Sequence, residues 1–456
     1  MINPHIFREY DIRGVVDKDL TEDLVILLAK AFGKFFLNNS AYKVAIGYDA
    51  RESSPRFRDL LVEGLTEVGC DVVDIGMVAT PILYYSQFAL DLAAGVMITG
   101  SHNPADNNGF KICLNKTTIF GHQVQQIKEN ALLGNFPSGI GRLERQDILN
   151  QYFDYIVSNI KPGSRKLKVV VDGGNGMGGI TAAPIYRALG HEVIELFCEP
   201  DSRFPNHHPD PTVIENMHSA ISAVKEHQAD LAIAFDGDGD RIGVVDEKGN
   251  IIWGDQLMVI FSRSILRQKT GATFIGEVKC SQTLFDDIAR HGGNAIMWKV
   301  GHSLIKSKMK EEKAALAGEM SGHIFFADRY FGYDDATYAG ARLLEILSQS
   351  EQPLSELLSD LPKTVYTPEL RLDCPDERKF TVVRELAEAF KKSHKVIDID
   401  GARIEFEHGW GLVRASNTQP VLVLRFEADS AEHLEEIRSL VEEKVIVLLE
   451  ACHKIL

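Results

Sequence analysis

The chain has 456 residues, too many for one ordinary hydrophobic core, and this length predicts three or four domains. Its 65 acidic and 49 basic side chains give a net charge of −16, which argues against general binding to nucleic acid or to an anionic membrane. There is no apolar run of membrane-spanning length and no signal-peptide core, and the six scattered cysteines lack a Cys-x-x-Cys pair, so we expect a reduced, cytoplasmic protein.

The first part of the chain predicts alternating helices and strands. Residues 9–14 are expected to form a short polar loop before a helix over 21–36. A buried strand over 43–48, a helix over 55–68 and a strand over 71–75 follow, with Gly69 ending the helix. A strand, a helix and a second strand of these lengths make a βαβ unit, which requires a parallel sheet.

The segment Thr99-Gly-Ser-His-Asn-Pro104 follows an apolar run over residues 93–98. This order predicts that the Ser101 hydroxyl lies at the carboxyl end of a strand, where open α/β sheets place their sites. His102 could then tune or bind a group on that hydroxyl. An ordinary ST- or Asx-turn is the alternative. Lys111 adds a cation downstream, although a lone lysine is usually a surface residue.

The same order of elements returns with a strand over 168–171, a helix over 181–189 and a strand over 192–196. Between the first strand and the helix, residues 172–179 contain Gly-x-Gly-x-x-Gly, a pattern typical of dinucleotide sites. Asp172 would set a carboxylate against the pyrophosphate, so a tight strand-to-helix turn is the favoured interpretation.

Three carboxylates alternate with glycines in Ala234-Phe-Asp-Gly-Asp-Gly-Asp-Arg241, between two apolar runs. Asp236, Asp238 and Asp240 would repel one another unless a cation lay between them, and oxygen-only ligands suit Mg²⁺. An EF-hand loop needs glycine where Arg241 stands, and an acidic hairpin turn needs only one Asp-Gly. Arg241 would lie beside the metal and pair with a phosphate.

A third unit has a strand over 273–277, a helix over 282–290 and a strand over 295–298. Glycines at 69, 190 and 292 each end a helix before a β-rich run, which indicates a repeated domain of about a hundred residues. The alternative is a set of unrelated βαβ units, which are common in α/β proteins.

In Ala317-Gly-Glu-Met-Ser-Gly-His-Ile324, polar side chains stand at every second position. In an extended loop Glu319, Ser321 and His323 would share one side, and glutamate and serine suit a pair of sugar hydroxyls. Lys279 and His302 are further basic candidates from the same unit.

The last part of the chain reads differently. Strands over 369–372, 396–400, 402–406, 411–413 and 421–426, with helices over 378–392 and 431–450, predict an antiparallel sheet carrying helices. Between the last two strands lie an arginine, two hydroxyls and an amide, which could together donate hydrogen bonds to one phosphate. A polar β-turn without a ligand is the alternative, and the residues favour the two interpretations equally. These residues are Arg414, Ser416, Asn417 and Thr418.

We therefore expect an α/β protein of four domains that pack together around shared clefts. Three similar βαβ-based domains with mixed or parallel sheets are expected over residues 1–147, 148–250 and 251–362, and an α+β domain with an antiparallel sheet over 363–456. No low-complexity linker separates them, so the domains should pack together, with motion mainly at the last junction.

The four loops in this order, with Tyr10-Asp-Ile-Arg-Gly14 near the start, resemble the α-D-phosphohexomutase superfamily, and most of all the bacterial phosphomannomutase/phosphoglucomutases. The resemblance implies that Ser101 is a phosphoserine and that it binds Mg²⁺ together with Asp236, Asp238 and Asp240. Glu319 and Ser321 would bind the hexose 3- and 4-hydroxyls, and the segment from Arg414 to Thr418 would hold the phosphate that is not transferred. The resemblance also implies that the four domains are arranged around a central cleft. The remaining residues implied to line this cleft are Tyr10, Arg13, Lys111, Arg241, Lys279, His302 and His323.

The implied reaction interconverts hexose 1- and 6-phosphates. Phospho-Ser101 gives its phosphoryl group to the free hydroxyl, and the resulting hexose 1,6-bisphosphate, such as glucose 1,6-bisphosphate, turns within the cleft before its other phosphate returns to the serine. Arg13, Lys111 and His323 are candidates for proton transfer, and rotation of the fourth domain would exclude water. The implied partners are small phosphosugars, and the expected state is a monomer or weak dimer.

One position departs from the family pattern. The run before the substrate histidine is often Lys-Thr-Gly-His, and here it is Lys299-Val300-Gly301-His302. A side-chain hydroxyl contact would be lost there, whereas a backbone contact near Gly301 could persist. The segment 318–323 suggests mannose and glucose phosphates as substrates, with glucosamine phosphate as the near alternative. A metal-dependent sugar phosphatase and a non-catalytic phosphosugar-binding protein are the alternatives of other classes.

Overall fold

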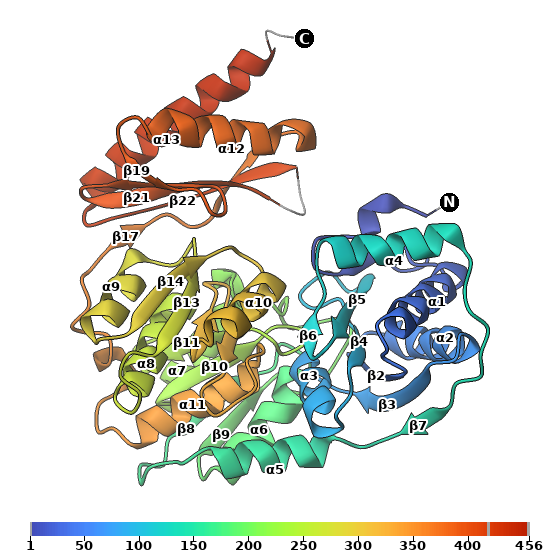
Figure 1. The fold of residues 1–456 in the computed structure, drawn as a ribbon. Coiled ribbons are helices and arrows are strands. Elements are labelled where there is room, and N and C mark those ends of the chain that lie inside the picture. Colours follow the sequence, from blue (N-terminus) through green and yellow to red (C-terminus); the bar gives the residue numbers. More distant parts are fainter. Residues whose placement is uncertain (1, 417–419, 454–456) are drawn as a thin grey trace.

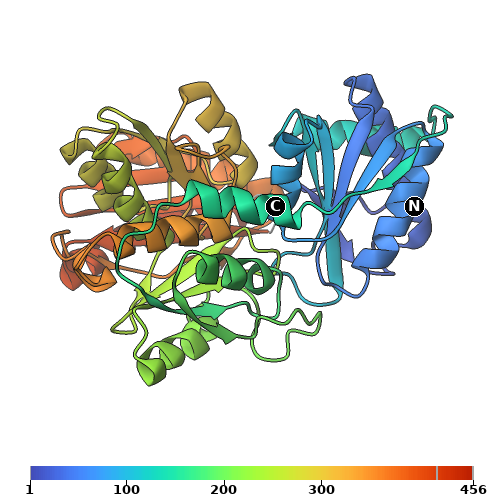
Figure 2. The same ribbon diagram turned by 90° about the horizontal axis from the view of Figure 1, so that it is seen from below.

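The computed structural model describes residues 2–416 and 420–453. Four β-sheets follow one another along the chain, and helices cover them (Figure 1). Seen from below, the helices α5 (Leu149–Asn159) and α11 (Ala336–Ser348) run across the middle of the molecule, between the sheets (Figure 2).

The first sheet has seven strands in the order β1-β5-β4-β2-β3-β7, with β6 paired to β5. β2 is parallel to β3 and β4, whereas β5 is antiparallel to β4 and to β1. Its strands are Ile12–Val15 (β1), Lys43–Tyr48 (β2), Asp71–Met77 (β3), Ala94–Ile98 (β4), Asn107–Leu114 (β5), Thr117–Thr118 (β6) and Leu143–Arg145 (β7). Its helices are Glu22–Asn38 (α1), Ser54–Glu67 (α2), Thr80–Ala89 (α3) and His122–Leu133 (α4).

The second sheet has five strands in the order β12-β11-β10-β8-β9, and the third has four in the order β14-β13-β15-β16. The strands of the second are Lys168–Asp172 (β8), Glu192–Leu196 (β9), Leu231–Phe235 (β10), Ile242–Asp246 (β11) and Ile251–Ile252 (β12). Those of the third are Thr273–Glu277 (β13), Asn294–Trp298 (β14), Leu316–Gly318 (β15) and Ile324–Phe326 (β16). The accompanying helices are Gly178–Ala188 (α6), His218–His227 (α7), Gly254–Leu266 (α8), Gln282–Arg290 (α9) and His302–Glu312 (α10).

These three sheets share one core topology. In each, the first strand of the βαβ unit is central, the second lies parallel on one side, the third lies parallel on the other side, and the fourth is antiparallel beyond the third. The orders are β3-β2-β4-β5, β9-β8-β10-β11 and β14-β13-β15-β16. The prediction of three similar βαβ-based domains is confirmed, and the antiparallel fourth strand makes each sheet mixed. The domain boundaries themselves stay predictions.

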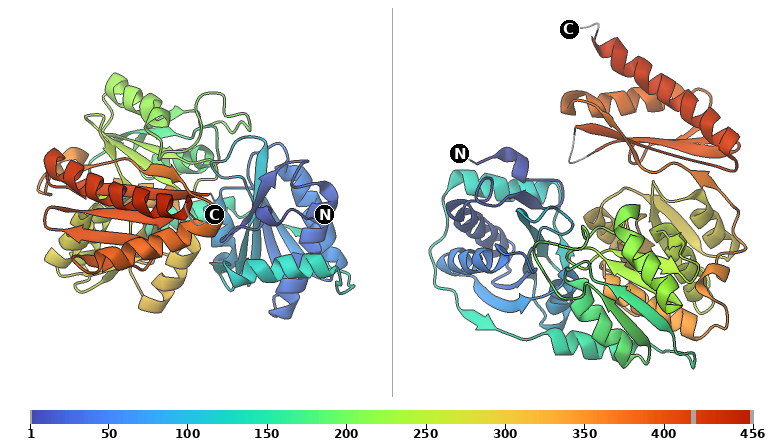
Figure 3. Two further views of the ribbon diagram at one scale, coloured as in Figure 1. Left: turned by 90° about the horizontal axis from the view of Figure 1, so that it is seen from above. Right: turned by 180° about the vertical axis from the view of Figure 1, so that it is seen from behind.

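The fourth sheet is wholly antiparallel, as predicted. Its order is β17-β22-β21-β20-β19, with β18 paired to β22. The strands are Val365–Tyr366 (β17), Leu370–Asp373 (β18), Lys395–Ile397 (β19), Ala402–Phe406 (β20), Gly409–Ala415 (β21) and Val421–Ala428 (β22). The helices Asp376–Phe390 (α12) and Ala431–His453 (α13) both lie on the face turned away from the other domains (Figures 1 and 3).

One apolar core runs through the first three domains. It includes Tyr84 beside the first sheet, Tyr186 beside the second and Tyr338 beside the third. Every residue of α11 is buried, and this helix contacts α6 and α8. A helix buried on all sides cannot be moved without exposing apolar surface, so the three domains form one packed block. The fourth domain has a core of its own, and a small cluster of Val278, Trp410 and Leu412 joins it to the third.

Two expectations about elements were wrong. Residues 12–15 form the edge strand β1 and not a loop, because Ile12 is fully buried and pairs with Phe110 on β5. The glycine-rich stretch opens α6 at Gly178, three residues before the expected start. A Cβ on Gly178 would meet Phe235 at 2.3 Å, so this glycine serves the close packing of the helix on β10.

The favoured interpretation of the glycine-rich stretch as a tight turn agrees with the structure. The N–H of Met177 donates to the carbonyl of Gly237 at 3.0 Å, and a Cβ on Gly176 would meet the same oxygen at 2.6 Å. The turn therefore packs directly, through main-chain atoms, against the aspartate-rich loop of the same domain.

Candidate active site

Three of the four predicted site loops occupy equivalent positions in the repeated topology. Each joins the third strand of a repeat to the antiparallel fourth: residues 99–106 lie between β4 and β5, 236–241 between β10 and β11, and 319–323 between β15 and β16. Equivalent loops leave the carboxyl ends of parallel strands, where α/β proteins place their sites. Ser101 contacts Asp236, and Arg241 forms a β-bridge with His323, so the three loops meet.

Ser101 lies in a strained turn with its hydroxyl directed at the loop of the second domain. Its φ of +48° is in the left-handed region, which costs a non-glycine residue about 1–3 kcal/mol and is typical of functional sites. Its Oγ donates to Asp236 Oδ2 at 2.8 Å and lies 3.1 Å from Nδ1 of His102. Its N–H donates to Thr99 Oγ1 at 2.8 Å, so both the backbone and the hydroxyl are fixed.

His102 and Arg13 lie beside this turn. Burial, followed by the charges of Arg241 and Arg13, holds the pKa of His102 well below its ordinary value, so the imidazole next to Ser101 is neutral. Arg13 stands on β1 and donates from Nε to Asp11 at 2.6 Å. Its side chain keeps 28% of its surface exposed, which leaves the guanidinium accessible to a ligand.

Arg51, which sequence analysis did not find, holds the Ser101 turn in place. The guanidinium is almost fully buried and donates to four backbone carbonyls. These belong to Ser101 (2.8 Å), Asn103 (2.6 Å), Pro104 (2.5 Å) and Asn107 (2.8 Å). The strained turn is thus stabilised by one cation that replaces water as the donor to its carbonyls.

The position of Arg51 explains why an aspartate stands at position 49 and a glycine at position 100. Its Nε lies 3.3 Å from Asp49 Oδ2, and the same carboxylate oxygen accepts the N–H of Gly100 at 3.1 Å. A Cβ on Gly100 would meet the guanidinium at 2.4 Å, so only glycine fits there. In the sequence, Arg51 could have been recognised only from its position two residues after Asp49, directly behind the first buried strand.

The three aspartates of the second loop are fully buried around Lys111. Lys111 donates to Asp238 Oδ2 at 2.7 Å and also to Asp240, and Thr80 donates to Asp238 Oδ2 at 2.5 Å. Among the described residues, Asp238 Oδ1 and Asp240 Oδ1 accept no hydrogen bond. Buried carboxylate oxygens without partners are costly, and a hard divalent cation would satisfy them, so these residues fit a metal ion.

The three carboxylates of this cluster repel one another. Burial, followed by repulsion from Asp240 and Asp238, raises the pKa of Asp236 well above its ordinary value. Burial also acts to raise the pKa of Asp238, but Lys111 outweighs it and the pKa lies below the ordinary value. Burial acts to lower the pKa of Lys111, and the carboxylates raise it overall. Lys111 and Arg241 thus face three crowded carboxylates, and a bound cation would relieve the repulsion among them.

Arg241 and His323 join the second and third loops. The Nε–H of Arg241 donates to Nε2 of His323 at 2.9 Å, so that nitrogen is an acceptor and the proton of the neutral ring is on Nδ1. Nδ1 lies 3.1 Å from Asp334 Oδ2 and 3.6 Å from Asp240 Oδ1. The histidine therefore stands between an arginine and two carboxylates.

The third loop is a tight turn and not the extended loop that was expected. The N–H of Glu319 donates to the carbonyl of His323 at 2.9 Å, and Gly322 takes a φ of +91°. The side chains of Glu319, Ser321 and His323 still lie together, since Ser321 Oγ donates to Glu319 Oε2 at 3.3 Å and His323 Nε2 lies 4.0 Å from the same oxygen.

Residues around Gly301 complete this part of the site. The N–H of Gly301 donates to Glu319 Oε1 at 2.6 Å, and a Cβ there would meet the ring of Tyr10 at 2.5 Å. The ring of His302 stacks on that of His323 with centroids 5.7 Å apart. Burial, followed by the charge of Lys306, lowers the pKa of His302 well below its ordinary value, so this ring is neutral as well.

The departure at Val300 leaves its backbone contacts intact. The Val300 carbonyl accepts from Tyr10 Oη at 3.0 Å, and its N–H donates to Asp400 Oδ2 at 2.9 Å. The same oxygen of Asp400 accepts from Arg414 Nη2 at 3.2 Å, which ties the fourth domain to this loop. The contacts at residue 300 are thus made by main-chain atoms.

Lys279 and the fourth loop lie next to Glu277, a second residue that sequence analysis missed. The fully buried Glu277 accepts the N–H of Lys279 at 2.5 Å and that of Met320 at 3.3 Å. Lys279 Nζ lies 3.3 Å from Glu369, and the charge of Arg414 also acts on it. Ser416 continues β21 through a bond from its N–H to Val421 at 3.0 Å, whereas Asn417 and Thr418 lie outside the described residues.

Across residues 2–416 and 420–453, no helix is long and apolar enough to cross a membrane.

Comparison with known proteins agrees with this arrangement. Models of the phosphoglucomutase/phosphomannomutase family match four successive segments of the chain. The alpha/beta/alpha domains I, II and III match residues 4–135, 150–249 and 253–365, and the C-terminal domain matches residues 369–444.

Whole-chain relatives carry the same family names. The chain is 48% identical over 434 residues to a phosphomannomutase/phosphoglucomutase of Pseudomonas putida, which covers 95% of this chain and 94% of that protein. It is 45% identical over 443 residues to a phosphoglucomutase of Neisseria gonorrhoeae, covering 96% of both. The crystal structure of a phosphoglucomutase/phosphomannomutase family protein from Burkholderia thailandensis superposes with a TM-score of 0.93 at 42% identity over 98% of both chains. The chain belongs to the phosphoglucomutase/phosphomannomutase family.

Proposed function

We propose that this protein interconverts hexose 1-phosphates and hexose 6-phosphates of mannose and glucose through a phosphoserine at Ser101. The single observation that supports this most strongly is the position of the Ser101 hydroxyl, 2.8 Å from a buried carboxylate of the aspartate cluster and held in a strained turn. A serine that only closed a turn would need neither the four carbonyl contacts of Arg51 nor an adjacent cluster with unsatisfied carboxylate oxygens.

The residues suit a phosphoryl transfer in two steps, first from Ser101 to the sugar and then from the sugar back to Ser101. The bond from phosphorus to Ser101 Oγ breaks as a bond to the free sugar hydroxyl forms. The sugar hydroxyl loses a proton and the released Ser101 Oγ gains one, and the candidates for these transfers are the cations Arg13 and Lys111 as donors and the neutral His323 as acceptor. The hexose 1,6-bisphosphate then turns, and its other phosphate returns to Ser101. Mg²⁺ held by Asp236, Asp238, Asp240 and the serine would offset charge on the transferred group. Arg241 and Lys111 add positive charge next to the same atoms.

The sugar and the second phosphate are assigned to the other two loops. Glu319 and Ser321, which share a hydrogen bond at 3.3 Å, suit neighbouring sugar hydroxyls, and main-chain atoms near Gly301 and Val300 suit further contacts. Arg414 and Ser416, with Asn417 and Thr418 beyond them, would hold the phosphate that is not transferred. Tyr10, Lys279 and His302 would line the same space. We expect the enzyme to work in the cytoplasm, without nucleic acid or membrane partners, as a monomer or weak dimer.

The test is turnover of mannose, glucose and glucosamine 1-phosphates to their 6-phosphates, with Mg²⁺ and a trace of glucose 1,6-bisphosphate. We expect comparable rates on mannose and glucose, and loss of both in Ser101→Ala. Ser393→Ala, which removes an exposed hydroxyl in the fourth domain, is the matched control and should keep full activity.

Three other outcomes are informative. A clear preference for glucosamine 1-phosphate would replace the proposed substrates with that of the phosphoglucosamine mutases. Release of inorganic phosphate without the 6-phosphate isomer would make the protein a metal-dependent sugar phosphatase. Full activity of Ser101→Ala would refute the phosphoserine mechanism.

A further inference from the structure

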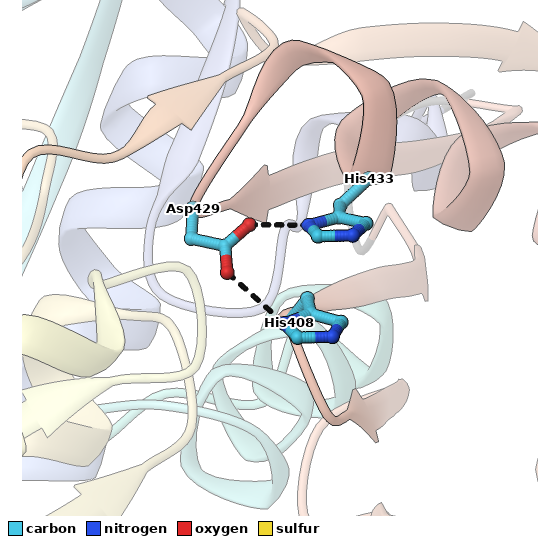
Figure 4. Close-up of side chains that lie close together, drawn as sticks. All are labelled: His408, Asp429 and His433. Carbon is cyan, nitrogen blue, oxygen red and sulfur yellow. Dashed lines mark hydrogen bonds and ion pairs between the residues drawn. The ribbon is translucent and has the colours of Figure 1, made fainter.

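Two histidines and an aspartate meet in the fourth domain, at the end of the β21–β22 hairpin opposite to Arg414 and Ser416 (Figure 4). His408 lies in the turn between β20 and β21, Asp429 directly follows β22, and His433 lies in the first turn of α13. The N–H of Asp429 donates to the carbonyl of His408 at 3.0 Å, which continues the register of β21 and β22 by one step. Ser430 caps the helix, accepting the N–H of His433 at 3.2 Å, and thereby fixes the third member.

The three side chains have a defined mutual geometry. Asp429 Oδ2 lies 3.0 Å from Nδ1 of His408, and Oδ1 lies 2.5 Å from Nδ1 of His433. The two imidazole rings are parallel within 7°, with centroids 4.0 Å apart. Because both Nδ1 atoms face one carboxylate, both Nε2 atoms face the other way, side by side (Figure 4).

In this geometry the Nε2 lone pairs of both histidines lie on the same side of the cluster. When each Nδ1–H donates to Asp429, the neutral rings carry their lone pairs on Nε2. Histidines that bind metals commonly donate their other N–H to a carboxylate, which fixes the tautomer and raises the basicity of the ligating nitrogen. With Zn–N bonds of about 2.0–2.1 Å, the two ligating nitrogens of a tetrahedral site lie about 3.3–3.4 Å apart. This is closer than the 4.0 Å between the ring centroids, so the two rings must tilt toward one another at Nε2 to bind one ion.

We propose that His408 and His433 bind a transition-metal ion of the zinc class through Nε2, with Asp429 as the carboxylate that orients both rings. Imidazole nitrogen suits zinc, copper and nickel, whereas the oxygen-only cluster around Asp236 suits magnesium, so the two sites differ in the ions that they take.

The surroundings leave the site accessible. The side chains of His408, Asp429 and His433 are 46%, 54% and 32% exposed, so an ion can reach them and water can complete its coordination. His408 and Asp429 also line a pocket of about 380 Å³ whose opposite wall includes Asp286 and Arg290 on α9 of the third domain. An ion at this site would link the β20–β21 turn to the start of α13, at the border with the third domain.

The experiment is a Zn²⁺ titration of the full chain in the presence of millimolar Mg²⁺, which keeps the aspartate cluster occupied. Free Zn²⁺ is read from a competing chromophoric chelator. We expect one Zn²⁺ per chain with a dissociation constant in the micromolar range or tighter. His408→Ala and His433→Ala should each weaken it at least about 100-fold, and Asp429→Asn, which removes only the orienting carboxylate, about 10–100-fold. Zn²⁺ should also raise the melting temperature of the wild type and not that of the two alanine variants.

His227→Ala, which removes an exposed histidine at the end of α7, is the matched control and should leave Zn²⁺ binding unchanged. The proposal is refuted if no Zn²⁺ binds under these conditions. It is also refuted if the bound Zn²⁺ is unaffected by both alanine variants or is lost in Asp238→Asn, since the ion would then occupy the aspartate cluster. Equal weakening in the His227→Ala control would mean non-specific binding to surface histidines and would refute it as well.

Discussion

At the scale of single residues, the buried carboxylate of Asp334 lies beside His323 and His302. Its Oδ1 accepts from Lys306 Nζ at 2.8 Å, and its Oδ2 lies 3.1 Å from Nδ1 of His323 and 3.7 Å from Nδ1 of His302. With the proton of His323 on Nδ1, its Nε2 is left free to accept from Arg241. We infer that Asp334 holds the Nδ1 proton of His323 and thereby positions this ring.

We expect Asp334→Asn to lower kcat about 100-fold with KM changed only a few-fold. The amide carries no charge to hold the Nδ1 proton of His323, and small displacements of a reacting group cost rates of this order. The measurement is steady-state kinetics on mannose and glucose 1-phosphates.

A second variant separates positioning from folding. Asp334→Asn leaves the buried ammonium of Lys306 unpaired, which costs about 3–5 kcal/mol of stability. The double variant Asp334→Asn/Lys306→Met removes both charges, so its melting temperature should recover while kcat stays low. Recovery of kcat together with the melting temperature would show that Asp334 acts only through stability.

Arg51 supports the strained turn at Ser101, and Arg51→Lys should expose that dependence. A lysine keeps the charge but cannot reach four carbonyls that are spread from Ser101 to Asn107, and each hydrogen bond to a charged group is worth about 1.5–3 kcal/mol. We expect kcat to fall about 100-fold and the fraction of chains phosphorylated by glucose 1,6-bisphosphate, measured by mass spectrometry, to fall with it. Arg56→Lys changes a partly exposed arginine on α2 and should behave as wild type. Equal phosphorylation in both variants would contradict this role for Arg51.

At the scale of elements, the glycine-rich turn before α6 is closed by His207. Its Nε2 lies 3.1 Å from both oxygens of Asp172, and its Nδ1 lies 3.0 Å from the carbonyl of His208, so both ring nitrogens face acceptors. Burial acts to lower the pKa of His207, but its hydrogen bond and attraction to Asp172 outweigh burial, and the pKa lies above its ordinary value.

A pKa raised by folding gives a stabilisation that is complete below the unfolded value and is lost as the pH rises through the folded value. The free energy of unfolding of the wild type should therefore be higher than that of His207→Gln, and this difference should be larger at about pH 5.5 than at about pH 8.5. Urea unfolding at both pH values measures the difference. His227→Gln, at the exposed end of α7, should show no such change, and a constant gap for His207→Gln would contradict the assignment.

The repeated elements were largely predictable from the sequence because their signals are local. Apolar runs over 43–48, 168–171 and 273–277 become the central parallel strands, and the glycines at 69, 190 and 292 all follow helices with positive φ. The same reasoning missed β1, since a four-residue edge strand with one glycine and one arginine carries no periodic signal.

The residues missing from the predicted site are those that act through long-range contacts. Thr80 reaches Asp238 across 158 positions, Arg51 reaches the Ser101 turn across about fifty, and Glu277 reaches Met320 across 43. Each is a buried polar residue whose role appears only when a partner from another segment is in place. The equivalence of the three site loops was likewise hidden, because it lies in strand order and not in residue type.

At the scale of the whole molecule, the fourth domain is attached differently from the other three. The first three share one continuous core, whereas the fourth meets the third through polar contacts around the small cluster of Val278 and Trp410. Ser281 Oγ donates to Glu427 Oε1 at 2.8 Å across this border, and the same oxygen accepts from Trp410 Nε1 at 3.1 Å. Polar contacts can be exchanged for water at low cost, so this is the junction at which motion is expected.

Arg403 is the central contact of that junction. It is fully buried, donates to the carbonyls of Val278 at 2.7 Å and Cys280 at 2.8 Å, and stacks on Trp410 with 3.8 Å between Cζ and the ring centroid. Burial lowers its pKa to about 10, which still leaves it charged at neutral pH. It therefore presents a cation of the fourth domain to main-chain oxygens of the third.

We expect Arg403→Met to loosen the fourth domain without unfolding the block of three. Methionine fills much of the same space but cannot donate, and two lost hydrogen bonds from a charged group amount to about 3 kcal/mol or more. Amide exchange in β20 and β21 should then become about 100-fold faster, while exchange in β2 and β8 stays unchanged. Arg438→Met, on the exposed side of α13, is the matched control and should leave all four strands unchanged. Faster exchange in all four strands of Arg403→Met would mean that the fourth domain stabilises the whole block, and unchanged exchange in β20 would mean that Arg403 does not hold the junction.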